Sequence, residues 1–492
     1  MGESSNAARQ ELDAAASTLQ GLLRKLGASG LDDILPAAAA ATSRLKGILK
    51  GLRADGDEGR QLDALQQLCE LLSIGSEESL VTFSVDSFVP VLVGLLHAEH
   101  SPDTMLLAAR ALTQLADVLP SSCAAIVHFD ALPAFCARLL TIEYIDLAEQ
   151  SLLALEKLSE EHGAACLRAG GLMAVLSYLD FFATGVQRTA VATAANMCRH
   201  LAPDCFDLAA DAAPALTQLL CRDDARLVRS ACEGLTRIAE AMSRHPERLQ
   251  KLASQELIEQ VMGLVSPAAG GGALRPSTHS GLLRLLALLC SASPGVPGQL
   301  LLSGACDAVQ HVLAGCSLVS AGSPSPAASP AFASAEQLYE AVSLAAALLP
   351  PAGAEMDEGA EEGPRKVAWQ QAVTLRASPE LSETYAESLL ALLMQVAGSS
   401  VGTPSRLRCV SAVTRLLHFA EAEVLERVLD RRALACLLSR LLAARDPELL
   451  LGALGAVDAA LTSSPSSAEL LVREGVVHRV EQLAAQAPPQ GE

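Results

Sequence analysis

Apolar residues recur along the chain at the three- and four-residue spacing of amphipathic helices. Over residues 148–158, Ala148, Leu152 and Leu155 share one helical face, while the acidic residues lie on other faces. A glycine turn and a second apolar stretch follow, ending at Leu179. The pattern therefore predicts a helical hairpin at this point in the chain.

The second apolar stretch recurs at a nearly constant interval. Anchored at Leu132, Leu172, Ala213 and Leu257, the steps are 40, 41 and 44 residues. A period of roughly 40 to 47 residues built from two or three helices is the signature of armadillo and HEAT repeats. The sequence therefore predicts an all-α fold, an armadillo- or HEAT-like right-handed superhelical solenoid of two- to three-helix repeats of about 40 residues, in which neighbours stack to form one core.

Helix starts are marked independently of this period. Each of three tripeptides combines a capping residue, a proline at the first helical position and an acid in the first turn: Ser101-Pro102-Asp103, Ser378-Pro379-Glu380 and Asp446-Pro447-Glu448. We expect helices to begin at the three prolines.

Segments rich in glycine, serine, proline or acid interrupt the repeats at 267–276, 322–333 and 350–364. Because they contain few apolar residues to offset the entropy of ordering, they are predicted to be disordered insertions. The Ser-Pro run in the second segment has an alternative interpretation as a phosphorylation site. The predicted organisation is a flexible N-terminal segment at 1–43, armadillo repeats at 44–320, disordered insertions around a short helix at 321–366, further armadillo-like repeats at 367–485 and a tail at 486–492.

Composition supports stacked helices and narrows the choice of partners. Half of the residues are hydrophobic but only 3% are aromatic, so the core must consist of Leu, Ala and Val, which excludes an all-β fold. The net charge of −20 opposes binding to nucleic acids and to anionic membranes. The N-terminus lacks the features of a secretory signal, and no apolar run reaches the roughly 20 residues that span a bilayer. We therefore expect an intracellular protein of the nucleus and cytoplasm.

The cysteines do not predict a metal or disulfide framework. The 13 residues are scattered from Cys69 to Cys436 without CxxC spacing, which favours buried thiols in a reducing compartment. His97 and His100 have a spacing that metal ligands can use, but no third-ligand pattern follows, which favours surface histidines. The sequence predicts no metal site and no cofactor.

One motif suggests hydrolase chemistry. Residues 398–402 fit the G-x-S-x-G pattern with Ser400 as the nucleophile, but the preceding residues 389–396 read as a helix. Hydrolases hold this serine on a turn between a strand and a helix, so an inter-helix loop is favoured here. We predict no catalytic residue in this chain.

Several segments carry a family resemblance. Residues 105–113, 119–123, 141–150, 171–182 and 194–198 closely resemble the armadillo region of plant HECT-type E3 ubiquitin ligases. These ligases belong to the ubiquitin-fusion-degradation group, which includes the vertebrate thyroid-receptor-interacting ligase. The resemblance is specific over about 45–240 and looser over 370–485.

The resemblance implies a function without its chemistry. In that family a cysteine of a C-terminal HECT domain accepts ubiquitin from an E2 and passes it to a substrate lysine. This chain ends just after the armadillo region, and none of its cysteines corresponds to that nucleophile. We expect a substrate-recruiting scaffold for polyubiquitination and ubiquitin-dependent degradation, inactive alone and reaching ubiquitin and E2 only through the missing HECT domain. The alternative is a stand-alone armadillo adaptor or transport protein with no ubiquitin role.

The third helix of each repeat supplies the candidate binding residues. Peptide-binding armadillo proteins grip the ligand backbone through asparagines at one position of this helix, and the corresponding residues here are Gln114, Lys157, Asn196, Arg237 and Arg415. Only Asn196 fits, and the chain has one other asparagine, Asn6, which argues against such a clamp.

Among the first four of these positions, Gln114, Lys157, Asn196 and Arg237, two carry a cation in an acidic protein. The positive charges of Lys157 and Arg237 predict that the concave surface binds an acidic or polar segment of a protein substrate. Gln114 and Asn196 lie on the same surface and complete the candidate binding residues. The alternative is that the two cations only pair with nearby carboxylates such as Glu156 or Glu240.

Overall fold

The computed structural model describes residues 31–80, 83–98, 101–141, 143–267, 274–320, 334–354, 363–463 and 467–486, and these residues form helices and connecting turns with no strand. The chain divides into two compact units, with the boundary between Tyr178 and Leu179. Because each unit has its own packing, the two are described separately.

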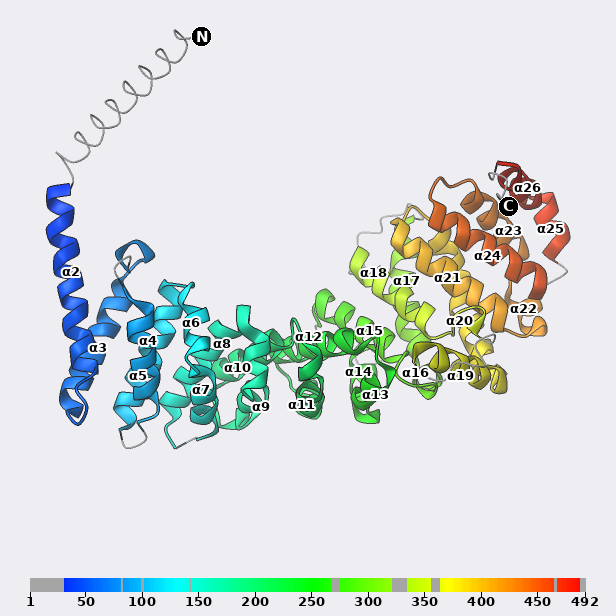
Figure 1. The fold of residues 1–492 in the computed structure, drawn as a ribbon. Helices are drawn as coiled ribbons and strands as arrows, with labels where there is room; N and C mark the ends of the chain where they lie inside the picture. Colours follow the sequence, from blue (N-terminus) through cyan, green and yellow to red (C-terminus); the bar gives the residue numbers. More distant parts are fainter. Residues whose placement is uncertain are drawn as a thin grey trace, which may run out of the picture. The chain divides into compact units, whose positions relative to one another are not determined.

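The first unit is a stack of helices in chain order (Figure 1). Its helices are α2 (Leu31–Leu52), α3 (Glu58–Ile74), the 3-10 helix η1 (Glu77–Leu80), α4 (Val85–Leu96), α5 (Pro102–Val118), α6 (Ser122–His128), α7 (Ala131–Leu140), α8 (Ile145–Arg168) and α9 (Gly171–Leu176). The long helices α3, α5 and α8 pack on one another in that order, and α7 packs between α4 and α9. The same position in successive repeats thus forms a continuous layer.

Helix α8 contains the junction between two repeats. Its backbone leaves the helical region at His162, with φ −113° and ψ 34°. Residues before this kink form the third helix of one repeat, and residues after it occupy the place of the short first helix of the next. Gly170 then adopts φ 81°, a left-handed conformation that favours glycine, and the chain turns into α9. The predicted glycine turn is therefore confirmed.

The second unit repeats the same three-helix plan. Its helices are η2 (Leu179–Phe181), α10 (Thr184–Met197), η3 (Pro203–Cys205), α11 (Phe206–Leu219), α12 (Ala225–Met242), α13 (Pro246–Leu252), α14 (Gln255–Val265), α15 (Pro276–Leu289), α16 (Gly295–Leu302), α17 (Ala305–Ser320), α18 (Ala335–Ala347), α19 (Pro364–Ala377), α20 (Pro379–Gly398), α21 (Thr403–Phe419), α22 (Ala422–Val428), α23 (Arg431–Leu442), α24 (Pro447–Ser463), α25 (Ala468–Arg473) and α26 (Val476–Gln486).

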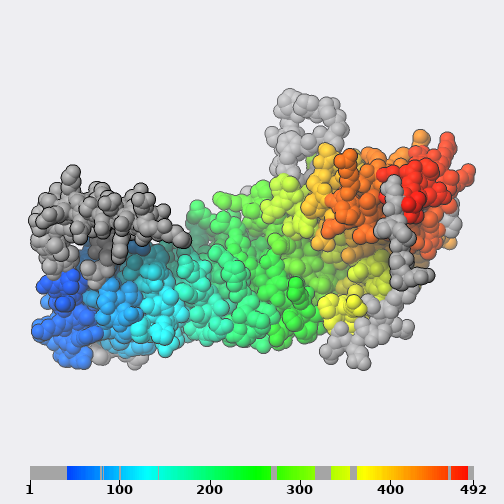
Figure 2. Space-filling model, turned by 45° about the horizontal axis from the view of Figure 1, so that its top comes forward, coloured from blue at the N-terminus to red at the C-terminus, as the bar shows by residue number. Residues whose placement is uncertain are grey.

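Third helices pack on third helices throughout this unit. The series α10, α12, α15, α18, α21 and α24 is continuous, and among the second helices α20 packs on α17 and α23 packs on α20. Across the unit, the colours of the space-filling view follow chain order, as expected when each repeat contacts its sequence neighbours (Figure 2). The prediction of an all-α armadillo-type solenoid is confirmed.

Leucines and small residues of the third helices form the core. Leu235, Leu286 and Leu416, on three different third helices, are fully buried. Burying such a side chain contributes about 2 kcal/mol. On α12 a methyl group added at Gly234 would lie 3.4 Å from a Leu216 side-chain carbon, so the small residue permits close helix approach. The core therefore has the Leu- and Ala-rich character that the composition predicted.

The three predicted helix starts are confirmed. Helices α5, α20 and α24 begin at Pro102, Pro379 and Pro447. At the last of these, an oxygen of Asp446 accepts hydrogen bonds from the backbone N–H groups of residues 448 and 449, at 3.0 and 3.4 Å. This carboxylate satisfies amide groups that have no partner within the helix.

The structure differs from the expected domain boundaries in two places. Helix α2 begins at Leu31, within the segment assigned to a flexible N-terminus. Helix α18, assigned to the insertions, is a regular third helix that packs between α15 and α21 and buries Ala341 and Val342 completely. Its alanine-rich face buries apolar area against both neighbours, which compensates for the entropy of ordering.

Some predictions lie outside the described residues. They include the insertion at 322–333, most of those at 267–276 and 350–364, residues 1–30 and residues 487–492. Within the described part of the chain, no single helix combines the length and apolar composition needed to cross a membrane; α6 and α7 reach both only as a pair bent by 75°.

Candidate functional site

The five aligned positions all fall near the C-terminal ends of third helices. Gln114 lies on α5 and Lys157 on α8 in the first unit, while Asn196, Arg237 and Arg415 lie on α10, α12 and α21 in the second. The repeat register inferred from the sequence therefore placed them on corresponding helices. Their interactions differ from one position to the next.

Lys157 forms an ion pair across two repeats of the first unit. Its Nζ lies 3.0 Å from Oδ1 of Asp117 on α5, and the two side chains are 41% and 45% exposed. The hydrogen bond that Lys157 donates to Asp117 raises the pKa of Lys157. The partner is thus not the neighbouring Glu156 but a carboxylate of the preceding repeat. Close by, Oε1 of Gln114 is buried and has no hydrogen-bond partner among the described residues.

Arg237 binds the end of the preceding third helix. Its Nη1 donates to the carbonyl oxygen of Ala195 at 2.6 Å, and Nη2 lies 3.6 Å from a carboxylate oxygen of Glu233. Asn196, the next residue of α10, accepts a hydrogen bond from Nη2 of Arg199 at 3.1 Å. A cation at a helix C-terminus interacts favourably with the helix dipole. Arg237 therefore connects α12 to α10.

Arg415 makes the same kind of contact three repeats further on. Its Nη1 donates to the carbonyl oxygens of Ala346 and Leu349, at 2.5 and 2.9 Å, where α18 ends. Burial lowers the pKa of this guanidinium group. Both Arg237 and Arg415 thus stabilise contacts between consecutive third helices.

A cavity of about 220 Å³ lies between α12, α15 and α18, and we call it the third-helix cleft. Its charged lining consists of three arginines and four glutamates: Arg229, Arg237, Arg284, Glu233, Glu240, Glu336 and Glu340. Of these, the sequence suggested Arg237 as a binding residue and Glu240 only as a possible ion-pair partner. The others were missed because the cleft requires α18, which had been assigned to the insertions.

All three arginines of the cleft have carboxylate partners. Nε of Arg284 lies 2.8 Å from Glu240, whereas Arg229 and Arg237 lie 3.8 and 3.6 Å from Glu233. Glu340 has no hydrogen bond or ion pair to another described residue, although only 7% of its surface is exposed. Burial raises the pKa of Glu340, and the nearby Arg284 partly opposes that rise. Among the described charged groups of the cleft, Glu340 therefore lacks an ion pair, while the buried Nε of Arg229 has an ion pair but no hydrogen bond.

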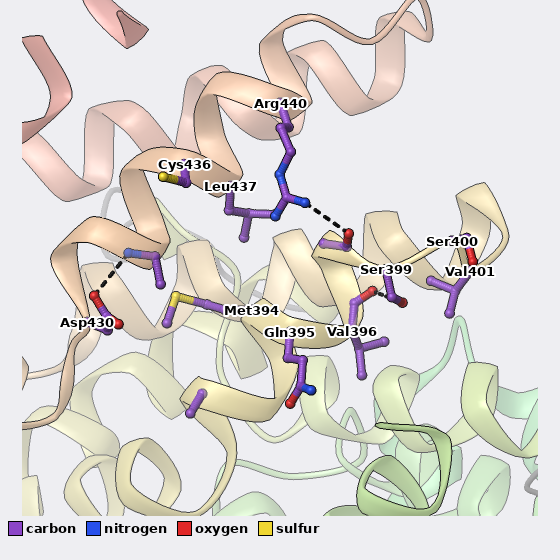
Figure 3. A pocket seen from close by; sticks show the side chains of 13 residues that line it. Met394, Gln395, Val396, Ser399, Ser400, Val401, Asp430, Cys436, Leu437 and Arg440 are labelled. Atoms are coloured by element: carbon purple, nitrogen blue, oxygen red, sulfur yellow. Dashed lines mark hydrogen bonds between the residues drawn. The ribbon is translucent and has the colours of Figure 1, made fainter. Parts of the chain in front are cut away.

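A larger cavity, of about 720 Å³, lies beside the C-terminal half of α20 and along α23 (Figure 3). Its two charged side chains bond within the protein: Nη1 of Arg440 donates to the Gly398 carbonyl at 3.3 Å, and Asp430 accepts from the Ala433 amide at 3.0 Å. Ser400 lies on the loop after α20, as the inter-helix interpretation predicted. No histidine is among the described residues lining this cavity, so Ser400 has no histidine base here.

Most of the described thiols are buried, and burial keeps them in the protonated, weakly nucleophilic form. Burial raises the pKa to about 12 for seven cysteines: Cys136, Cys166, Cys198, Cys232, Cys290, Cys306 and Cys409. Because the thiolate is the nucleophile, these groups are poor candidates for thioester chemistry.

The structure describes only part of the candidate histidine pair. His97 follows the last residue of α4, while His100 lies outside the described residues. Across the described ranges, no group of three or more His, Cys, Asp or Glu residues is arranged to hold a metal ion.

The fold and the cleft define an armadillo-type solenoid with a charged surface on its third helices. Residues 29–168 match a family described as E3 ubiquitin-protein ligase TRIP12-like, TPR repeats. In this region α5 and α8 begin 43 residues apart, which is the armadillo period rather than the 34 residues of TPR repeats.

Relatives over nearly the whole chain are ubiquitin ligases. The chain is 46% identical to the E3 ubiquitin-protein ligase UPL3 of Arabidopsis thaliana over 97% of its own length. It is 32% identical to the E3 ubiquitin-protein ligase TRIP12 of Danio rerio over 91% of its length. It spans about a quarter of each relative, 27% and 25%. The resemblance to the repeat region of this ligase group is confirmed.

Comparison with solved structures supports the fold alone. An engineered protein superposes with a TM-score of 0.65 at 18% sequence identity, and the match covers 91% of this chain and 95% of that one.

Proposed function

We propose that this chain is the substrate-recruiting armadillo scaffold of a HECT-type E3 ubiquitin-protein ligase that acts in polyubiquitination and ubiquitin-dependent degradation. The observation that carries the proposal is the 46% identity to a plant ligase over 97% of the chain. Because the chain spans 27% of that relative, ligase activity itself would require the HECT domain, where ubiquitin and E2 would bind.

The physical properties of the repeats support recruitment rather than catalysis. Consecutive third helices present a charged cleft, and stacked repeats offer extended surfaces to protein partners. The cysteines that the structure describes form no disulfide bond. They support the further proposal that the protein works in a reducing compartment, the nucleus or the cytoplasm.

Replacement of the homologous region in the plant ligase tests this function. In cells lacking that ligase, a version carrying the present chain in place of its own 46%-identical repeats should restore the ubiquitinated proteins that the intact ligase produces. A matched version lacking the repeats is the control. Ubiquitinated peptides identified by mass spectrometry provide the readout. If the chimera and the repeat-free version give the same peptides at equal expression, the recruiting role is excluded.

A stand-alone armadillo adaptor or transport protein remains the alternative. It would share the solenoid but would not restore ubiquitination in the chimera. A peptide clamp like that of transport-type armadillo proteins is poorly supported, because Asn196 is the only asparagine at the aligned positions and it bonds to Arg199.

A further inference from the structure

The third-helix cleft contains a buried carboxylate with no partner. Glu340 lies on α18 and lines the cavity, and 7% of its surface is exposed. A buried ionised carboxylate is costly unless a cation or several donors compensate for its lost hydration. Within the described part of the chain, no hydrogen bond or ion pair provides that compensation.

Arg284 of α15 and Arg408 of α21 act electrostatically on Glu340 without forming a described ion pair with it, and Arg237 lines the same cleft. Of the two arginines that act on the Glu340 pKa, Arg284 has the larger effect, and its Nε lies 2.8 Å from Oε1 of Glu240. Arg237 donates to the Ala195 carbonyl at 2.6 Å and also lies near Glu233. Neither Arg284 nor Arg237 can pair with Glu340 without giving up a contact that joins two helices. The cleft thus has room for a further cation and a buried acceptor for it.

We propose that the third-helix cleft binds a basic side chain, arginine or lysine, of a protein segment, with Glu340 as the buried acceptor and Glu336 as a second acceptor one turn away on α18. This inference rests on the proposed recruiting function and names the class of segment recruited. It also reverses the polarity expected from the sequence, because the cations that suggested an acidic partner are already paired.

The chemistry and the size of the cleft agree with this ligand. A guanidinium group donates two parallel hydrogen bonds to a carboxylate, and such charge-assisted bonds are stronger than neutral ones. A cavity of about 220 Å³ accommodates one long side chain rather than a folded element. The lining itself has four glutamates and three arginines, so it offers more carboxylates than guanidinium groups to an incoming cation.

Peptide binding to the full chain tests the proposal. Two short fluorescent peptides of equal length would be compared by fluorescence anisotropy, one with arginines alternating with glycine and serine, the other with glutamates at the same positions. We expect the arginine peptide to bind and the glutamate peptide to bind at least about tenfold more weakly. Equal binding of the two, or preference for the glutamate peptide, would overturn the proposal.

Variants of single carboxylates locate the site. Glu340→Gln should weaken binding of the arginine peptide by about tenfold, since it removes one charge-assisted interaction. Glu387→Gln removes the same charge from a paired residue of α20, outside the cleft, and should change binding by less than about twofold. Equal effects of the two variants would mean general attraction to an acidic protein and would contradict a specific acceptor.

A variant at the exposed edge of the cleft provides a second test in case Glu340→Gln does not fold. Glu336 is exposed, so Glu336→Gln should leave thermal unfolding unchanged and weaken the arginine peptide by about threefold. No weakening would overturn the placement. If the chimera restores ubiquitination but the arginine peptide does not bind, only the proposal for the cleft is rejected. If the arginine peptide binds but the chimera does not restore ubiquitination, the proposal for the cleft is supported and the ligase role is rejected.

Discussion

The two units place a cation at corresponding third-helix positions but use it differently. In the first unit, Lys157 reaches an exposed carboxylate, Asp117, at 3.0 Å. In the second, Arg237 reaches a main-chain carbonyl, that of Ala195, at 2.6 Å. Both contacts join neighbouring repeats. One depends on the identity of a partner side chain, and the other needs only the end of a helix.

The difference follows from the chemistry of the two side chains. An ammonium group is a strongly hydrated point charge, whereas a guanidinium group is more weakly hydrated and presents several donors in a fixed plane. Arginine can therefore enter a partly buried junction and bond to carbonyls that have no partner within their helix. The same repeat position is consequently a surface bridge in one unit and a junction between helices in the other.

Alkaline pH should produce the largest effect and should separate the two units. Folded thiols with a pKa of about 12 keep their protons above pH 9, where thiols of the unfolded chain lose theirs. The unfolded state is then favoured, so the free energy of unfolding falls as pH rises from about 9 to about 12, by roughly 1.4 kcal/mol per unit for each such thiol.

The second unit should lose more stability, because five thiols raised to about 12 lie in it against two in the first. Fluorescence of Trp369, the only tryptophan, reports on the second unit, while circular dichroism reports on both. Denaturation midpoints measured across this pH range should fall first by fluorescence. The Cys290→Ala variant should show a shallower pH dependence. Midpoints that do not change with pH would contradict the buried-thiol explanation.

Replacement of Arg415 should have the next largest effect. Arg415→Ala removes two hydrogen bonds to carbonyls at the end of α18 and should lower the free energy of unfolding by about 3 kcal/mol. Arg415→Lys, which retains the charge but not the planar donors, should recover only part of the loss. Chemical denaturation followed by Trp369 fluorescence measures both variants. A loss below about 1 kcal/mol for Arg415→Ala would mean that the junction contributes little.

Periodicity and capping signals predicted much of the fold, because both are local consequences of helix geometry. The spacing of Leu172 and Ala213 revealed the repeat, and Pro379 marked the start of α20. A short helix was expected between the insertions, but the sequence before it, rich in serine and proline, hid that α18 (Ala335–Ala347) belongs to the series of third helices. Its burial depends on α15 and α21, which are distant in sequence.

The candidate site was harder to predict for the same reason. Alignment placed Arg237 on the correct helix but could not show that its guanidinium group binds the Ala195 carbonyl. Glu340 gave no local signal, since glutamates on an alanine-rich helix, here Glu336 and Glu340, are typical of a solvated face. Its significance appears only when α12, α15 and α18 pack together. The interactions of third-helix residues therefore depend on contacts between repeats, and an alignment of single positions carries no information on those contacts.

The smallest effect is expected at Lys157 and provides the sharpest contrast between the units. Lys157→Ala removes one exposed ion pair and should lower the free energy of unfolding by less than about 1 kcal/mol, and by less still at high salt. Arg237→Ala should cost about twice as much and should depend less on salt, because its main contact is a partly buried carbonyl. A double-mutant cycle with Asp117→Ala isolates the coupling of Lys157. The contrast between the units would be wrong if the coupling free energy of Lys157 and Asp117 did not depend on salt and equalled the loss of unfolding free energy in Arg237→Ala. Lysine would then join its repeats as strongly as arginine.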